Sequence, residues 1–195
     1  MSMLKPGKIK KIGIWCLAIA LFVSHVLLRV AYAEETPAEP WKEVLSRTGD
    51  CRILFPSVPK LVQQSLNVSE KGHKLLYDIY LAPLQGKSLC LLLVATYPFP
   101  LKGGHEIAGL DGLLRGIVGN NPANQLVYAN VLEHQGHPVV DFLVQSPTSF
   151  FRGQALMINN KLYLIAIEGK AGDLDEAAFA KFAQSFSLMP VSDNK

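Results

Sequence analysis

Cysteine is scarce in this sequence, with three residues among 195. Cys16 lies in an apolar N-terminal segment, which leaves Cys51 and Cys90 as one possible pair in the rest of the chain. A single disulfide between them is compatible with an oxidising compartment, and the alternative is two buried free thiols that pack as small apolar side chains. A chain of this length can bury enough surface to fold on its apolar core alone, without a disulfide framework.

Motifs that identify enzymes are also missing. The chain has no Gly-x-Ser-x-Gly sequence, and neither Cys51 nor Cys90 lies in a recognisable catalytic context. No pair of acidic residues suggests glycoside chemistry. The sequence therefore predicts a protein that is not an enzyme and that uses no cofactor.

Metal-ligating residues form only one suggestive pair. If Gln135 and Gly136 make a two-residue hairpin turn, His134 and His137 lie opposite each other, with Cβ atoms about 5 Å apart. A structural zinc site needs four ligands, and a solvated hairpin tip is the simpler interpretation. His134 and His137 are therefore weak candidates for metal ligands.

Excess positive charge is confined to the N-terminus. The chain has 19 Lys and Arg against 16 Asp and Glu, but five of the basic residues and none of the acidic ones precede Glu34. Beyond that point the acidic residues outnumber the basic ones, so the basic surface that nucleic-acid binding requires is lacking. Acidic lipids gain no attraction either, and membrane contact is expected only through the N-terminal segment.

The first 33 residues have the three parts of a secretory signal. Four lysines at positions 5–11 precede an apolar run, and Ala31-Tyr32-Ala33 supplies the small residues that signal peptidase accepts, which predicts cleavage after Ala33. The alternative is an uncleaved anchor, because 12–30 is long enough to cross a bilayer. We expect an exported protein, periplasmic or extracellular, or one anchored to the inner membrane by 12–30.

The remainder is predicted to form a single domain at 49–190, between a spacer at 34–48 and a tail at 191–195. One helical turn is expected near Trp41, within the spacer. Alternating apolar residues and turn signals predict strands at 51–55, 61–69, 73–81, 88–96, 125–133, 139–145, 150–158 and 162–167. The strands at 88–96 and 162–167 are apolar on both faces, which is typical of strands that are covered on both sides.

Two helices are expected to provide that cover. The first spans 105–118, with an apolar stripe formed by Ile107, Leu110, Leu114 and Ile117. The second begins after Asp173 or Asp175, either of which can cap it, and its apolar face includes Ala178, Phe179, Phe182 and Phe186. Strands joined by hairpins and interrupted by two helices predict an α+β domain with a mostly antiparallel sheet.

A proline-containing loop follows the strand at 88–96 and carries Tyr97, Phe99 and Leu101. Rigid aromatic side chains are enriched at the centres of protein interfaces and lose little entropy on binding. These three residues are therefore candidates for partner binding. The alternative is that Phe99 and Leu101 fold back and cover the glycine-rich helix.

Several short phrases, in this order, resemble the PsbP-like superfamily, named for an extrinsic subunit of photosystem II. They are FPSVP at 55–59, GHP at 136–138, NKLYL at 160–164, and Phe182 followed by SFSL at 185–188. The residue Cys51 departs from the family pattern, which often has an aromatic there, and the loop at 97–104 matches no pattern of the family. The resemblance implies an α/β/α sandwich around a mostly antiparallel sheet of about seven or eight strands.

The resemblance also bears on function, because members of this fold are mostly binding or assembly modules. Together with the secretory signal, this favours an exported, non-enzymatic interaction or assembly module that binds an unidentified protein of the cell envelope. The alternative is an envelope protein that binds a small ligand or a metal, using His134 and His137.

Overall fold

The computed structural model describes residues 40–67, 72–84, 88–100 and 106–189. The expected signal segment with its cleavage site after Ala33, the residue Leu101 and the expected C-terminal tail lie outside these ranges. Within them, neither helix is long and apolar enough to cross a membrane.

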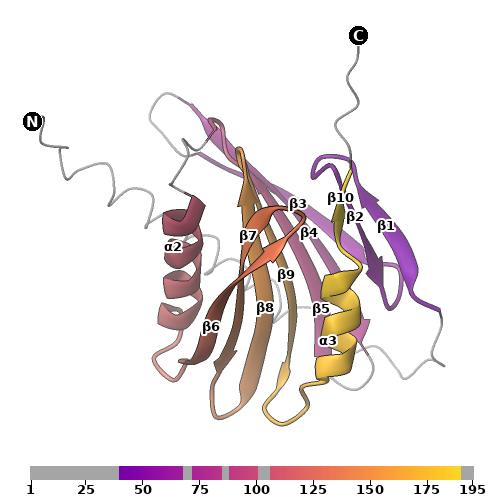
Figure 1. The fold of residues 1–195 in the computed structure, drawn as a ribbon, viewed down its shortest axis with the longest axis vertical. Helices are drawn as coiled ribbons and strands as arrows, with labels where there is room; N and C mark the ends of the chain where they lie inside the picture. The colour runs from indigo at the N-terminus through magenta and orange to yellow at the C-terminus, as the bar shows by residue number, and fades with distance from the viewer. Residues whose placement is uncertain (1–39, 68–71, 85–87, 101–105, 190–195) are drawn as a thin grey trace, which may run out of the picture.

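A seven-stranded sheet forms the centre of the domain (Figure 1). Its order is β3-β4-β5-β9-β8-β7-β6, and every neighbouring pair is antiparallel. The strands are β3 (Lys60–Asn67), β4 (Lys74–Leu84), β5 (Ser88–Thr96), β6 (Gln125–His134), β7 (His137–Gln145), β8 (Ser149–Ile158) and β9 (Lys161–Lys170). The expected antiparallel sheet is confirmed.

The central strands of this sheet are buried on both faces. Along β5, Leu91, Leu93 and Ala95 belong to one core cluster, while Cys90, Leu92 and Val94 belong to the other. Such alternation between two cores is what a strand that is apolar on both faces predicts, since successive side chains point to opposite sides. The prediction for β5, and the same one for β9, is confirmed.

Helix α2 (Glu106–Gly119) covers one face and packs against β7 and β8. Its buried residues are Gly109, Leu110, Leu113 and Gly116, whereas Ile107 is 46% exposed. The expected stripe was therefore wrong at Ile107. Close approach to the sheet explains the difference, because a Cβ built on Gly109 would lie 2.7 Å from Sδ of Met157. Gly109 and Gly116 are thus part of the contact face of the helix, because glycine lets the backbone approach the sheet closely.

Helix α3 (Glu176–Gln184) and a second sheet cover the other face (Figure 1). The second sheet has the order β1-β2-β10, with β1 (Lys42–Ser46), β2 (Cys51–Phe55) and β10 (Ser187–Leu188). Asp175 caps α3 by accepting a hydrogen bond from the backbone N–H of Ala178, at 2.9 Å, which confirms one of the two expected caps. The three-layer α+β architecture is confirmed.

The helical turn that was expected at Trp41 to Leu45 does not form. Residues 42–46 form β1, which pairs along its whole length with β2. Val44 and the Trp41 ring also pack on the core beneath α3, and the Trp41 ring lies 6.3 Å from that of Phe182. Long-range pairing thus overrides the local helical preference, and the folded domain includes part of the expected spacer at 34–48.

The possible disulfide between Cys51 and Cys90 is not formed, and both thiols are free and buried. Atoms of Cys51 and Val94 both lie about 3 Å from a Cβ built on Gly49, so Cys51 faces β5 at Val94. Cys90 precedes Val94 by four residues in β5, which separates these two positions by roughly 13 Å at about 3.3 Å per residue. A disulfide needs Cα atoms within about 7 Å, so the strand positions prevent it.

Candidate functional site

The two candidate metal ligands lie at the tip of the β6–β7 hairpin. His134 and His137 are directly opposite in the register, as predicted, and the turn residues Gln135 and Gly136 have φ values of 51° and 78°. Two positive φ values are typical of the turn that joins strands through two residues. The predicted geometry of the pair is therefore confirmed.

His134 also makes a contact that the sequence did not predict. Its Nε2 lies 3.2 Å from the carbonyl oxygen of Phe186, and the side chain of Gln135 accepts a hydrogen bond from the N–H of Leu188 at 3.2 Å. The hairpin tip is thus tied to the chain that follows α3. Among the described residues, no three His, Cys, Asp or Glu side chains come together as a metal site.

The loop after β5 separates its two aromatic residues. Tyr97 is 8% exposed and belongs to the core beneath α2, with its backbone N–H donating to the carbonyl of Asn160 at 2.7 Å. Tyr97 therefore contributes no contact surface, contrary to the expectation. Phe99 is 52% exposed, and its ring meets that of His73 edge-on at a centroid distance of 6.2 Å.

Phe99 and the histidine pair lie at the same end of the sheet but do not form one site. Phe99 follows the last residue of β5, His134 is the last residue of β6, and His137 is the first residue of β7, so all three lie at the same end of the antiparallel sheet. Strands β5 and β7 are three positions apart in the sheet, which separates them by roughly 14 Å at about 4.8 Å per strand. The sequence candidates therefore define two separate features.

Sequence reasoning missed a charged network beneath α3. Arg152 of β8 and Asp141 of β7 are 7% and 6% exposed, and they form two parallel contacts, Nη1 to Oδ1 at 2.8 Å and Nη2 to Oδ2 at 3.1 Å. Gln154 donates to the same carboxylate at 2.9 Å. A bidentate pair with further hydrogen bonds is the geometry that offsets the cost of burying two charges.

The same arginine connects the sheet to α3. Its Nε donates to Glu176 in the first turn of the helix at 3.2 Å, and its guanidinium lies 4.0 Å from the ring centre of Phe179. Its Nη1 also donates to the carbonyls of Phe142 and Gly153. Because these contacts occupy the guanidinium, the network holds α3 in place and offers no open anion site. Two residues of opposite charge within adjacent apolar strands were the sequence signal for it.

A second polar network lies near the opposite edge of the sheet. Asp78 of β4 is buried, accepts a hydrogen bond from Thr48 Oγ1, and accepts another from Gln63 of β3 at 2.9 Å. The Tyr163 hydroxyl donates to the carbonyl of Gly49 at 2.7 Å. These contacts attach the β1–β2 turn to the main sheet.

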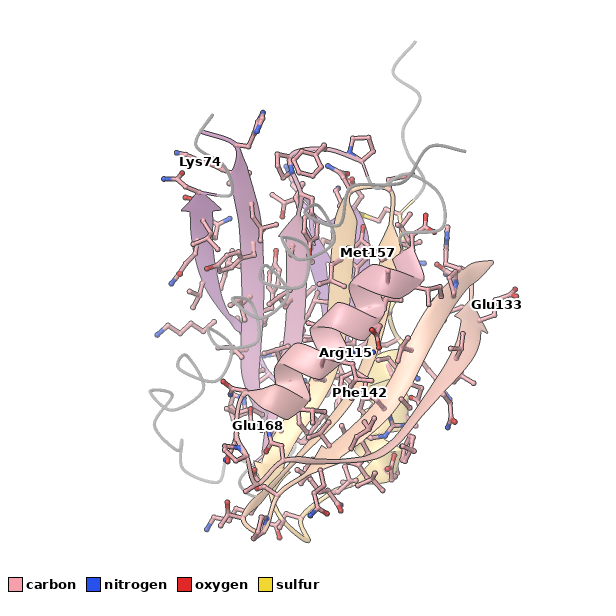
Figure 2. The ribbon with its side chains drawn as sticks, turned by 90° about the vertical axis from the view of Figure 1, so that its left-hand side faces the viewer. Lys74, Arg115, Glu133, Phe142, Met157 and Glu168 are labelled. Atoms are coloured by element: carbon pink, nitrogen blue, oxygen red, sulfur yellow. The ribbon has the colours of Figure 1, made fainter. Side chains whose placement is uncertain are left out.

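The outermost strand β6 is exposed on both faces. Its side chains Leu126, Val127, Val131 and Leu132 are 44%, 52%, 65% and 49% exposed. Figure 2 looks onto α2 and shows Glu133 at the outer margin of the sheet, beyond the helix. Helix α2 packs on β7 and β8, and α3 on β9 and β2, which leaves β6 largely uncovered.

One acidic residue lies near the end of the central strand β9. Glu168 of β9 lies opposite Leu89 and Phe151 and, by alternation from Ala166, on the face that α2 covers (Figure 2). Burial raises the pKa of its carboxyl to about 7. This group therefore changes charge near neutral pH.

Comparisons with known proteins place this architecture among PsbP-like folds. No family model matches the sequence, and no curated protein does. The structure is similar to the solution structure of cyanobacterial PsbP (CyanoP) from Synechocystis sp. PCC 6803, with a TM-score of 0.53, 10% sequence identity, and coverage of 82% of this chain and 98% of that one. At this identity the likeness shows the fold, which confirms the architecture that the sequence phrases implied.

Proposed function

We propose that this protein is an exported, non-enzymatic module that binds a protein partner of the cell envelope. The partner site is the surface around Phe99, in the loop after β5. The observation that carries the proposal is the contrast within one short loop: Tyr97 is buried, while Phe99 is 52% exposed between Pro98 and Pro100. A rigid, exposed aromatic side chain suits an interface centre. The PsbP-like fold supports a binding or assembly role.

The non-enzymatic part of the proposal is supported by the state of the thiols. Burial raises the pKa of the Cys51 thiol to about 12 and raises the pKa of the Cys90 thiol as well. Neither group is a thiolate near neutral pH, and a thiol is a weak nucleophile. The buried carboxylate of Asp141 and the guanidinium of Arg152 are likewise occupied by each other.

Export is supported by the signal-like sequence at 1–33 and is tested by the mass of the purified protein. We expect a chain that begins at Glu34, as predicted by the small residues Ala31 and Ala33. A chain that begins at Met1 and fractionates with membranes would instead support the anchored alternative.

Photo-crosslinking tests the partner site directly. A benzophenone amino acid in place of Phe99 is expected to crosslink to one discrete envelope protein in living cells. The matched control carries the same group in place of Val58, an isolated apolar residue that is 72% exposed. The same crosslinks from both positions, or none from position 99, would contradict the proposal.

A second candidate function is metal binding at the hairpin tip, favoured by the direct opposition of His134 and His137. A metal that binds only the folded protein must raise its Tm. Zinc is therefore expected to raise the Tm of the natural protein and not that of a His137→Ala variant. An unchanged Tm in the natural protein rejects this candidate.

A further inference from the structure

The exposed edge of β6 lacks most of the features that keep sheet edges apart. Edge strands are usually protected by lysines, prolines, bulges or short length. The strand β6 has ten residues, with Glu133 as its single acidic residue and no lysine, arginine or proline. Its register with β7 shifts once, between Leu126 and Tyr128, and is regular from Tyr128 to His134. A regular stretch of this length can pair with another strand.

Side chains on both faces of β6 would gain from such pairing. Ala129 and Val131 lie opposite Phe142 and Val140 of β7, on the α2 side of the sheet. Tyr128 and Leu132 lie opposite Leu143 and Val139, on the α3 side. An added strand would therefore cover apolar surface on both sides as well as satisfy the outer backbone groups of β6.

We propose that β6 pairs antiparallel with β6 of a second copy of this chain, about a two-fold axis at Asn130. In this register Tyr128 lies opposite Leu132 of the other copy, and Ala129 lies opposite Val131. Asn130 lies opposite Asn130, where each carboxamide can both donate and accept a hydrogen bond. In this register, the side chains of β6 are complementary to those of β6 in the second copy.

Charge favours this arrangement over a parallel one. Two parallel copies in register would place Glu133 beside Glu133, and like charges at neighbouring positions are destabilising. The antiparallel register places the two carboxylates at opposite ends of the paired stretch, each across from Val127. A two-fold contact also limits the assembly to a dimer. Each copy uses its one apolar edge in the contact, and the other edge, β3, is largely polar and offers no second apolar site.

The pairing extends the proposed function without depending on its partner site. Phe99 follows the end of β5, which is four strand positions from β6. Self-association through β6 therefore leaves the surface around Phe99 accessible. Five residues of each copy, 128–132, pair within the regular stretch and form a small interface. We therefore expect a reversible dimer with a Kd on the order of micromolar.

Sedimentation velocity over a range of concentrations tests the pairing, with the protein produced from its full-length sequence and purified from the cells that make it. The natural protein is expected to shift from monomer to dimer. Val131→Lys is expected to weaken the dimer by about a hundredfold, since each dimer contains the substitution twice and a lysine protects an edge strand. The matched control, Gln64→Lys on the exposed strand β3, is expected to leave the dimer unchanged.

A cysteine at the axis tests the register independently of any loss of stability. Asn130→Cys is expected to give a disulfide-linked dimer on mild oxidation, whereas Gln64→Cys is expected to stay monomeric. A natural protein that is monomeric at all concentrations, with no Asn130→Cys dimer, would overturn the inference. A β6-dependent complex with a different protein only would also overturn it. Crosslinking from position 99 reports on partner binding and not on self-association, so partner binding at Phe99 and pairing through β6 can each fail independently.

Discussion

The two edges of the seven-stranded sheet differ in the side chains that they present. Five of the eight residues of β3 are polar, and one of them, Gln63, is held by a hydrogen bond to the neighbouring strand. Six of the ten residues of β6 are apolar, and four of those have large side chains that are more than 40% exposed. One edge is therefore suited to water and the other to a partner.

A buried aspartate accompanies each edge, and the two differ in their partners. Asp78, next to β3, accepts hydrogen bonds from the neutral groups of Thr48 and Gln63, and the structure gives it no cation partner among the described residues. Asp141, next to β6, is paired with the buried Arg152. The apolar edge is thus supported from inside by a charged pair, whereas the polar edge is supported by hydrogen bonds from neutral groups near the surface.

Loss of Arg152 should have the largest effect on stability. Arg152→Met leaves the Asp141 carboxylate buried without its cation, which costs about 3–5 kcal/mol of unfolding free energy. Urea denaturation measures this loss. The double variant Asp141→Leu with Arg152→Met should recover much of it, because no unpaired charge remains. A single variant as stable as the natural protein would show that the pair does not support the β6 side.

Stability should depend on pH through Glu168, near the end of β9. Its pKa is about 7 in the folded protein and near 4.5 when unfolded, so the folded state binds more protons between these values. Stability therefore falls as pH rises from about 4.5 to 7 and is constant above, by up to about 3 kcal/mol. Glu168→Gln should match the natural protein at pH 4 and exceed it at pH 8 in urea denaturation. Equal stabilities at pH 8 would contradict the assignment.

Loss of Asp78 should cost less than loss of Arg152. Asp78→Ala leaves Thr48 and Gln63 without their acceptor, but both are neutral and Gln63 is exposed, so water can replace the carboxylate. We expect a loss of about 1–2 kcal/mol in the same urea experiment. If Asp78→Ala were the more destabilising variant, the proposed difference between the two edges would be reversed.

Most of the architecture could be predicted from the sequence because local patterns determine it. The run at 88–96 is apolar on both faces, and it forms β5 between two cores. The Gln135-Gly136 turn fixes the register of His134 and His137 through backbone conformations that few residues adopt.

Features that depend on distant contacts could not be predicted in this way. The segment after Trp41 forms β1 because β2 pairs with it, and Tyr97 is buried because Asn160 holds its backbone. Gly109 faces the sheet because Met157 fills the space that a side chain would need. The exposure of β6 depends on where the two helices pack on the sheet, and the residues of β6 alone do not predict that packing.

Amide hydrogen exchange in β6 tests most directly whether the two edges differ because one of them pairs with a second copy. We predict that amides of 128–134 exchange more slowly as protein concentration rises, while amides of 60–67 in β3 exchange at the same rate throughout. Exchange in β6 that is independent of concentration, or slower exchange at β3 instead, would show that β6 does not pair with a second copy.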